Sequence, residues 1–295
     1  MNSRIETLQS FCKINLFLQV TGRRPDNYHT IETLFLLLDN PQDQILINWD
    51  HPDGLAVVSD TPGVPSGPGN LIYRAAEKYA AWAQIRPDWH IDLHKKIPVA
   101  AGLGGGSGNA GRILAALESH YGLLGKDRLH ELGASLGADI PFFLTPASAW
   151  GSGVGEKLAF LEKAGKPLYF VLANPGFPVG VKWSYSQLDA SCFKPVDPEQ
   201  KAAMIEAVQN GDARSVAGLL RNDLAAGLWR KFPLLVLLKK AMLDNGLLAV
   251  EVSGSGPTLF GIAENETAAQ TAVKALETEF SPESGIRFFT GRSVI

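Results

Sequence analysis

A glycine-rich stretch at residues 98–109 constrains the fold of this chain more than any other feature. It follows an alternating segment, residues 90–97, that predicts a strand, and it precedes apolar residues at the four-residue spacing of an amphipathic helix, namely Ile113, Leu117 and Tyr121. Glycine lets a backbone approach a ligand closely, and the first turn of a helix offers unpaired N–H groups and a partial positive charge. The stretch therefore predicts an anion site, most naturally for phosphate. The alternative is a mobile loop whose glycines only permit a sharp turn.

Other phosphate-binding motifs fit the sequence less well. A Walker A loop ends in Gly-Lys-Ser or Gly-Lys-Thr, and the Gly-Lys pairs at Gly125 and Gly165 lack the hydroxyl residue. Residues 106–111 match the dinucleotide-binding pattern G-x-G-x-x-G, which should follow a buried parallel strand immediately. The strand expected here carries polar residues such as Asp92 and ends several residues earlier. The protein-kinase motifs His-Arg-Asp and Asp-Phe-Gly are absent from the sequence.

The composition is that of an ordinary globular protein with a sizeable core. Of the 295 residues, 45% are hydrophobic and 19% charged, and the net charge of −3 argues against a strong polyanion-binding surface. The two isolated cysteines, Cys12 and Cys192, indicate a reducing compartment rather than a disulfide framework or a zinc site. The N-terminus lacks the apolar core of a signal peptide, and no apolar run approaches the roughly 20 residues that span a bilayer. We expect a cytoplasmic protein, a monomer or weak homodimer, that binds neither nucleic acid nor membrane.

Alternation and turn residues predict a strand-rich first half. Residues 11–20 alternate like a half-buried strand, and a turn at 24–27 follows, because proline presets φ and asparagine tolerates positive φ. Asn70 is well placed to cap a helix at about 71–84, after a loop rich in Pro and Gly at 59–70. Further strands are expected at 31–38, 44–49 and 55–58, and a short helix around Leu129, Leu132 and Leu136.

The second half has a different order of expected elements. We expect a domain boundary near residues 150–166, where glycine and charged residues become frequent. Its expected order is strand, helices, two strands, helix and strand, which apart from extra helices is the split βαβ pattern. We therefore expect an α+β protein with domains at residues 1–155 and 156–295. The expected strands are 168–173, 247–252, 258–263 and 286–290, and the expected helices are 198–209, 212–220, 232–245 and 266–280.

In its glycine-rich stretch the sequence resembles the GHMP kinases, whose ATP loop has the form Pro-x-x-x-Gly-Leu-Gly-Ser-Ser or a close variant. Further segments resemble the branch of that family that phosphorylates a cytidyl diphosphate sugar alcohol. The resemblance implies a two-domain fold with a deep cleft between an N-terminal nucleotide domain and a C-terminal split βαβ domain. It also implies ATP-dependent phosphorylation of an alcohol group in non-mevalonate isoprenoid synthesis, with Mg²⁺ accompanying ATP and no protein metal cage. The matching segments, which extend over nearly the whole chain, are residues 13–18, 22–29, 70–75, 102–109, 137–143, 222–224 and 252–258.

The same resemblance implies the catalytic residues. Asp139 would be the base that faces the substrate hydroxyl, and Lys13 would keep that carboxylate charged and lower the charge cost near the triphosphate. Asn15, which shares a strand face with Lys13, would orient the acceptor hydroxyl. From the residues alone, Asp139 could simply cap a helix that begins at Ile140 and Pro141, and Lys13 and Asn15 could lie on a solvated strand face.

The binding residues are implied in the same way. Tyr28 would stack on cytosine and His29 would hydrogen-bond its edge, although ordinary packing of both side chains is the alternative. A backbone anion nest for the substrate diphosphate would form at Gly254, Ser255 and Gly256, which also suit a hairpin turn. Contacts to ATP are implied for Asn70, Lys95, Pro98, Gly102, Leu103, Gly104, Gly105, Gly106, Ser107, Gly108 and Asn109.

Two other functions stay open. One is another GHMP kinase of the homoserine or mevalonate type, against which the tyrosine–histidine pair after the first turn argues. The other is a non-catalytic nucleotide-binding regulator, against which the presence of both implied catalytic residues argues. The chain departs from the family pattern at Gly108 and Gly111, where residues of higher helix propensity are usual, so we expect a softer start to that helix.

Overall fold

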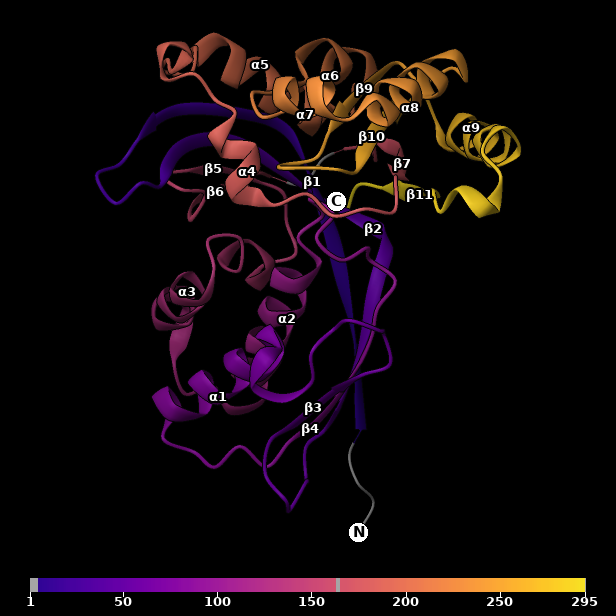
Figure 1. Ribbon diagram of the computed structural model, residues 1–295. Helices are drawn as coiled ribbons and strands as arrows, with labels where there is room; N and C mark the ends of the chain where they lie inside the picture. Colours follow the sequence, from indigo (N-terminus) through magenta and orange to yellow (C-terminus); the bar gives the residue numbers. More distant parts are fainter. Residues whose placement is uncertain (1–4, 163–164, 295) are drawn as a thin grey trace. The chain divides into compact units, whose positions relative to one another are not determined.

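The computed structural model describes residues 5–162 and 165–294, and for Cys192 its backbone alone. The chain forms two compact units, each assembled from separate segments (Figure 1). Unit 1 comprises Met1–Cys12, Gln42–Ile97 and Gly104–Pro146, and unit 2 comprises Lys13–Pro41, Pro98–Leu103 and Ala147–Ile295. The domain boundary expected between residues 155 and 156 stays a prediction.

Two long strands open the chain. The strand expected at 11–20 is confirmed and is longer, as β1 (Ile5–Arg23), and the turn at 24–27 follows it with Asn27 at a φ of 69°. The strands expected at 31–38 and 44–49 are one strand, β2 (His29–Asn48), so that division was wrong. Pro41 lies within β2 between the residues that pair with β5 (33–35) and those that pair with β4 (44–48), so its missing N–H removes no bond from these two ladders.

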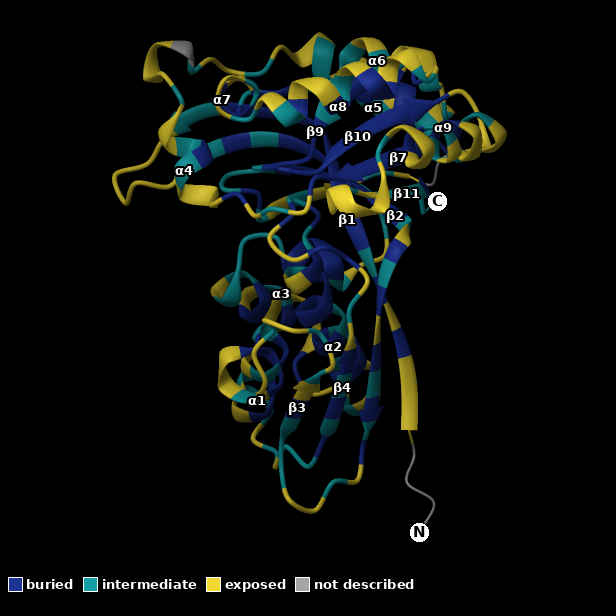
Figure 2. Cartoon of the chain, turned by 45° about the vertical axis from the view of Figure 1, so that its right-hand side comes forward, coloured by how far each residue is buried: buried dark blue, intermediate teal, exposed yellow. Residues whose placement is uncertain are grey.

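Unit 1 packs helices against a small sheet. In that sheet β4 (His90–His94) pairs antiparallel with β2 and parallel with β3 (Ala56–Ser59). The expected helices are confirmed as α1 (Leu71–Ala83), α2 (Gly105–Tyr121) and α3 (Gly125–Leu136), and a short 3-10 turn, η2 (Pro141–Leu144), follows α3. Another such turn, η1 (Gly67–Gly69), precedes α1. The helices bury one face each in a core that contains Tyr79, Trp89 and Leu117, and their outer faces are exposed (Figure 2).

Unit 2 contains the predicted split βαβ arrangement. Its four-stranded sheet has the order β11-β7-β10-β9, and all three adjacent pairs are antiparallel. These strands are β7 (Tyr169–Asn174), β9 (Ala249–Val252), β10 (Leu259–Ala263) and β11 (Arg287–Arg292). The unit's parts of β1 and β2 are neighbours in the other sheet. There β2 also pairs with a hairpin of β5 (Ala149–Ser152) and β6 (Lys157–Phe160), and β1 pairs in parallel with β8 (Arg221–Asn222).

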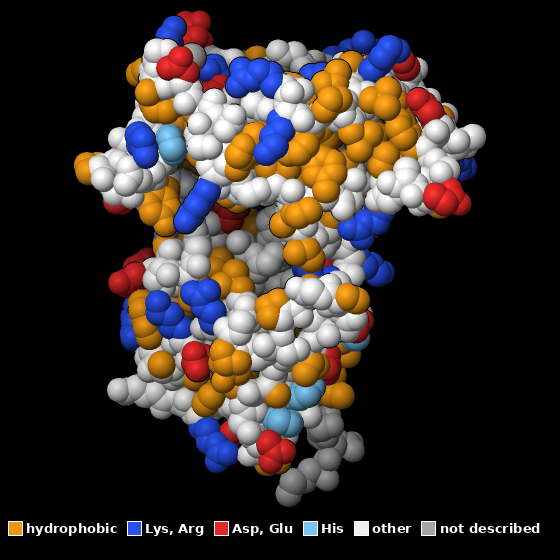
Figure 3. All heavy atoms as spheres, in the orientation of Figure 1, with side chains coloured by type: hydrophobic (Ala, Val, Ile, Leu, Met, Phe, Trp, Pro, Cys, Tyr) orange, Lys and Arg blue, Asp and Glu red, His pale blue; other side chains and the backbone are white. Residues whose placement is uncertain are grey.

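Helices α6 (Ala213–Leu219), α8 (Pro233–Asp244) and α9 (Glu266–Glu279) pack against the four-stranded sheet of unit 2 (Figure 1). The expected helices are confirmed as α5 (Pro198–Asn210), α6 (Ala213–Leu219), α8 (Pro233–Asp244) and α9 (Glu266–Glu279). Two helices were missed, α4 (Val181–Ser186) and α7 (Ala225–Lys231), together with the 3-10 turns η3 (Ala190–Cys192) and η4 (Pro282–Ser284). The α+β class is therefore confirmed. On the outer side, α8 exposes Val236 and Leu237, and Figure 3 shows hydrophobic and basic side chains mixed over this part of the surface.

Candidate active site

The first part of the glycine-rich loop, residues 98–103, belongs to unit 2 and packs against the turn after β9. A Cβ added to Gly102, whose φ is 79°, would lie 2.1 Å from the carbonyl oxygen of Ser253, so no other residue fits there. The Ser253 hydroxyl in turn donates a hydrogen bond of 2.9 Å to the Gly102 carbonyl. The backbone N–H of Thr258 donates to the carbonyl of Ala101 at 3.3 Å. The two glycine-rich turns singled out in the sequence are therefore in direct contact.

A buried polar chain lies beside these turns on β1. The Nζ atom of Lys13 donates to Oδ1 of Asn15 at 2.6 Å, and Nδ2 of Asn15 donates to Oγ1 of Thr33 at 2.8 Å. Lys13 and Asn15 are 5% and 1% exposed, so the alternative of a solvated strand face is wrong. The Lys13 backbone N–H also donates to the carbonyl of Leu103 in the loop, at 3.0 Å. Strand β1 thus presents a buried cation and an ordered amide next to the glycine-rich loop.

The second glycine turn comes close to the same pair. A Cβ on Gly254, whose φ is 56°, would lie 3.1 Å from Oδ1 of Asn15 and 3.5 Å from Nζ of Lys13. Asn222 holds this turn in place, because its Nδ2 donates to the carbonyls of Val252 and Gly254, both at 2.8 Å. Asn222 was matched to the family in the sequence but given no role, and the structure assigns it this support. Further along the turn, the Ser184 hydroxyl donates to the carbonyl of Ser255 at 3.0 Å, and Gly256 has a φ of 76°.

An aromatic cluster forms around His29, also within unit 2. The imidazole stacks on the ring of Tyr185 at a centroid distance of 5.0 Å, and the ring of Phe193 meets it edge-on at 5.8 Å. Partial burial, with the positive charge of Arg23, lowers the pKa of His29, so its neutral form is favoured near pH 7. Tyr28 is instead 62% exposed and has its ring at the surface. Tyr185 and Phe193 were missed, because α4 carries no helix-start signal and neither residue lies in a recognised motif.

The second part of the loop, from Gly104 onward, belongs to unit 1 and begins α2. Gly104 occupies the N-cap position with a φ of 70°, and no side chain caps the helix there, so the first-turn N–H groups have no side-chain acceptor at the cap. Asn109 is buried, and its Oδ1 atom has no hydrogen-bond partner among the described residues. The buried ammonium of Lys95 also reaches this turn, since Nζ would lie 3.5 Å from a Cβ on Gly105. An ammonium and the first-turn N–H groups therefore lie close together where α2 starts.

Two other residues of unit 1 were expected to take part. Asn70 caps α1, with Oδ1 accepting from the N–H of Ile72 at 2.9 Å and Nδ2 donating to the carbonyl of Pro65 at 2.8 Å. A role of Asn70 in ATP binding stays a prediction. Asp139 lies between α3 and η2, where the N-cap of η2 is Ile140, and it is partly exposed.

The glycines at 108 and 111, which depart from the family pattern, have a packing role. A Cβ on Gly108 would meet the carbonyl oxygen of Phe11 at 3.0 Å, and one on Gly111 would meet Cβ of Phe143 at 2.7 Å. Larger residues would therefore collide with neighbouring backbone and core side chains. The helix continues without a break from Gly105 to Tyr121, so these glycines allow close packing.

Within the described ranges, no group of three or more His, Cys, Asp or Glu side chains is arranged to hold a metal ion. No helix in the part of the chain that the structure describes is long and apolar enough to cross a membrane.

The chain matches the family models of the GHMP kinases. Residues 70–146 match the GHMP kinases N terminal domain, and residues 204–282 match the GHMP kinases C terminal model. A 4-diphosphocytidyl-2-C-methyl-D-erythritol kinase of Geobacter sulfurreducens is 36% identical over 272 residues, which are 92% of this chain and 94% of that protein. A relative of the same name from Alkaliphilus metalliredigens is 34% identical over 97% of both chains.

Solved structures agree with these matches. The crystal structure of a 4-(cytidine 5'-diphospho)-2C-methyl-D-erythritol kinase has a TM-score of 0.81 and 34% identity, covering 98% of this chain and 99% of that one. A homoserine kinase from Cytophaga hutchinsonii shares the fold, with a TM-score of 0.71 at 19% identity over 98% of this chain and 95% of that one. From the family models and from relatives that match over nearly their whole length, this chain belongs to the GHMP kinases, in the branch of the 4-diphosphocytidyl-2-C-methyl-D-erythritol kinases.

Proposed function

We propose that this chain transfers the γ-phosphoryl group of ATP to the 2-hydroxyl of 4-diphosphocytidyl-2-C-methyl-D-erythritol, a step of non-mevalonate isoprenoid precursor synthesis. The observation that carries the proposal is the buried Lys13–Asn15 pair, which lies against both glycine-rich turns in a chain of this family. A buried ammonium and an ordered amide beside two glycine-rich turns suit a phosphorylated substrate. The relatives that carry this name support the choice of acceptor.

The chemical step is a direct transfer. The 2-hydroxyl oxygen bonds to the γ-phosphorus as the bond from that phosphorus to the β–γ bridging oxygen breaks, and the hydroxyl proton passes to the carboxylate of Asp139. ADP leaves with the bridging oxygen. Phosphoryl transfer depends on positioning and charge neutralisation, so the N-terminal turn of α2 would stabilise the negative charge on the transferring group. Mg²⁺ bound to the triphosphate would supply further charge neutralisation.

The cytidine end of the acceptor is assigned to the cluster around His29. The neutral imidazole has one donor and one acceptor nitrogen for the edge of a base. The rings of Tyr185 and Phe193 hold that imidazole, and exposed Tyr28 offers a face on which cytosine stacks. The turn at Gly254–Gly256 would receive the diphosphate through the backbone N–H groups of Gly254 and Ser255, because the N–H of Gly256 donates to the carbonyl of Ser253 at 2.9 Å. The same proposal includes a cytoplasmic location and a monomer or weak homodimer.

A panel of acceptors tests the reaction. With MgATP and the purified full chain, ADP release should require the cytidyl diphosphate substrate, and mevalonate and homoserine should give little above background. Preference for either of those two compounds would assign a different GHMP activity. Nucleotide binding without turnover on any acceptor would indicate a regulator instead.

Replacement of Asp139 by asparagine tests the base. A positioned general base contributes roughly 10²–10⁴-fold, so Asp139→Asn should lower kcat at least about a hundredfold. The affinity for ATP, measured by calorimetry, should hardly change. Asp127→Asn, on the exposed first turn of α3, is the matched control and should keep full turnover. Near-normal kcat in Asp139→Asn would refute the assignment.

A further inference from the structure

Asp43, on β2, is a fully buried carboxylate that the sequence analysis did not single out. Its side chain is 0% exposed and forms an ion pair with Nζ of Lys95, whose side chain is 7% exposed. Its Oδ1 atom also accepts from the backbone N–H groups of Lys96 at 2.7 Å and Ile97 at 2.8 Å. All three donors come from the residues immediately before the glycine-rich stretch. One carboxylate therefore fixes both the Lys95 side chain and the backbone that leads into Pro98.

The position of Lys95 explains why such a carboxylate is needed. Nζ of Lys95 would lie 3.5 Å from a Cβ on Gly105, the first residue of α2. A cation at the positive end of a helix dipole is unfavourable by itself, and a buried ammonium is costly without a counter-ion. Asp43 supplies that counter-ion. An ammonium has three N–H donors, and Oδ2 of Asp43 accepts one of them, so the group can serve an anion as well.

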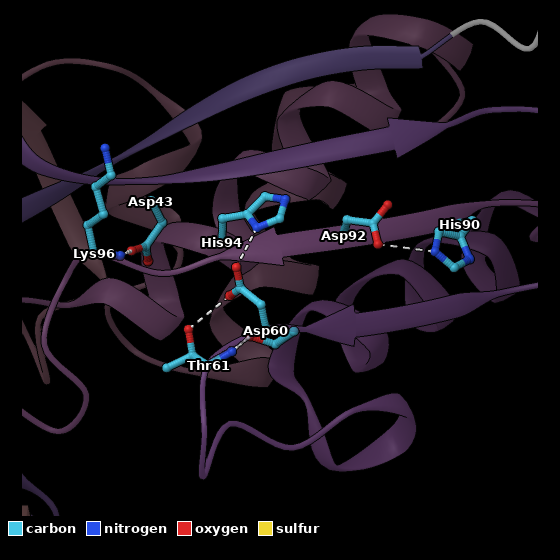
Figure 4. A network of polar contacts seen from close by, with 8 residues as sticks. Asp43, Asp60, Thr61, His90, Asp92, His94 and Lys96 are labelled. Carbon is cyan, nitrogen blue, oxygen red and sulfur yellow. Dashed lines mark hydrogen bonds and ion pairs between the residues drawn. The ribbon is translucent and has the colours of Figure 1, made fainter.

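Figure 4 shows Asp43 next to the backbone of Lys96, and further along the same part of unit 1 two other acid–base pairs, His94 with Asp60 and His90 with Asp92. Those two pairs have side chains 31–57% exposed, so solvent screens them. The pair of Asp43 and Lys95 is shielded from solvent. It is also the one of the three whose cation reaches the start of α2.

We propose that Asp43 is a positioning residue for nucleotide binding. It holds the ammonium of Lys95 at the first turn of α2, so that the cation and the free N–H groups of the helix together receive a phosphate group of a nucleoside triphosphate. Asp43 itself touches no ligand and acts through Lys95. The inference rests on the ATP-dependent kinase function proposed above and adds the residue that orients its phosphate-binding lysine.

Three variants of the full chain test it: Asp43→Asn, Lys95→Met and the double variant. The Asn carbonyl still accepts the backbone N–H groups of Lys96 and Ile97, and the double variant buries no charge, so it should fold even where Asp43→Asn alone does not. Affinity for MgATP is measured by calorimetry without acceptor, and KM for the cytidyl diphosphate substrate by ADP release. Asp92→Asn, which breaks the exposed pair with His90, is the control and should bind MgATP like the original chain.

Asp43→Asn and Lys95→Met should each weaken MgATP binding about tenfold, the effect of losing one charge-assisted hydrogen bond. KM for the acceptor should stay within about twofold, and the double variant should bind MgATP no more weakly than Lys95→Met. If the role of Asp43 were purely structural, Asp43→Asn would change both the MgATP affinity and the KM for the acceptor. Its effect on MgATP affinity would then add to that of Lys95→Met in the double variant. Unchanged MgATP affinity in a folded Asp43→Asn variant, or a further loss in the double variant, overturns the proposal. If the original chain binds MgATP but phosphorylates no cytidyl compound, only the proposed acceptor is refuted. The role of Asp43 is still tested, because MgATP affinity is compared among the variants without any acceptor.

Discussion

Single residues in this chain are selected by contacts that a helix-propensity scale does not describe, and Gly111 shows this well. Alanine stabilises an exposed helix position by up to about 1 kcal/mol relative to glycine. At Gly111 the added methyl group would lie 2.7 Å from Cβ of Phe143 and 3.1 Å from the carbonyl oxygen of Ile140. Overpacking of this kind costs about 1–3 kcal/mol. Gly111→Ala should therefore lower the free energy of unfolding by roughly 1 kcal/mol, as measured by urea denaturation.

Gly218 is the matched control for that prediction. It lies in α6, is exposed, and a Cβ there would meet nothing within 4 Å. Gly218→Ala should raise the free energy of unfolding by up to about 1 kcal/mol, because only the propensity term acts. If both alanines were stabilising, the close packing of α2 on η2 would not be the reason for glycine at 111.

The residues of the candidate site differ in how far the sequence predicted them. Lys13, Asn15 and Gly254 were predicted from the family resemblance, because they lie in short matching segments, and the structure brings them together. Asp43 was not, because its partner Lys95 is 52 residues away and no local pattern connects the two. Tyr185 escaped for the same reason, since only the folded chain places it on His29.

At the scale of elements, the helices that the sequence predicted in unit 2 mostly carry a start signal. Asp197, Asp212 and Asn265 cap α5, α6 and α9 through side-chain hydrogen bonds. The N-cap residues of the missed helices α4 and α7 are Gly180 and Leu224, which make no such bond, and the two helices have six and seven residues. Helices this short depend on tertiary packing, which a local pattern does not contain.

Glu118 connects three elements of unit 1. From α2 it accepts the backbone N–H groups of Leu124 at 3.1 Å and Gly125 at 2.7 Å where α3 starts, and the hydroxyl of Tyr79 on α1 at 2.8 Å. Burial alone would raise the pKa of Glu118, but these hydrogen bonds outweigh it and hold the pKa below its usual value. The folded state therefore binds the proton less readily than the unfolded chain does, and the carboxylate stabilises the fold above the unfolded pKa.

Glu118→Gln should lower the free energy of unfolding at pH 7 by about 1–3 kcal/mol, because charge-assisted hydrogen bonds are lost. The difference in unfolding free energy between the variant and the original chain should shrink as the pH falls below about 4.5. In that range Glu118 of the unfolded chain is protonated first, and Glu118 of the folded chain is protonated at lower pH, so the stabilisation by its charge is lost. Denaturation curves from pH 7 to pH 3 measure this. A difference that stays constant with pH would mean that the charge of Glu118 is not what connects the helices.

At the scale of the whole molecule, β1 and β2 each supply core residues to both compact units. Leu8 and Ile45 lie in the core of unit 1, whereas Leu18, Val20 and Ile31 lie in a core cluster of unit 2. Unfolding of either unit would therefore free one end of a strand whose other end belongs to the unit that stays folded. We expect the two units to unfold in one cooperative transition.

Core truncations in the two units test this expectation. Leu132 of unit 1 and Leu238 of unit 2 are both 0% exposed, so Leu132→Ala and Leu238→Ala should each cost about 2–5 kcal/mol. Each should lower the same Tm by several degrees in calorimetry, and the intrinsic tryptophan fluorescence, to which buried Trp89 contributes, should report the same midpoint as the loss of far-ultraviolet circular dichroism. Leu237→Ala, at a position 53% exposed, should change Tm little. Two resolved transitions, with each core variant shifting only one, would show that the shared strands do not couple the units, since each unit would then keep its own stability when the other is unfolded.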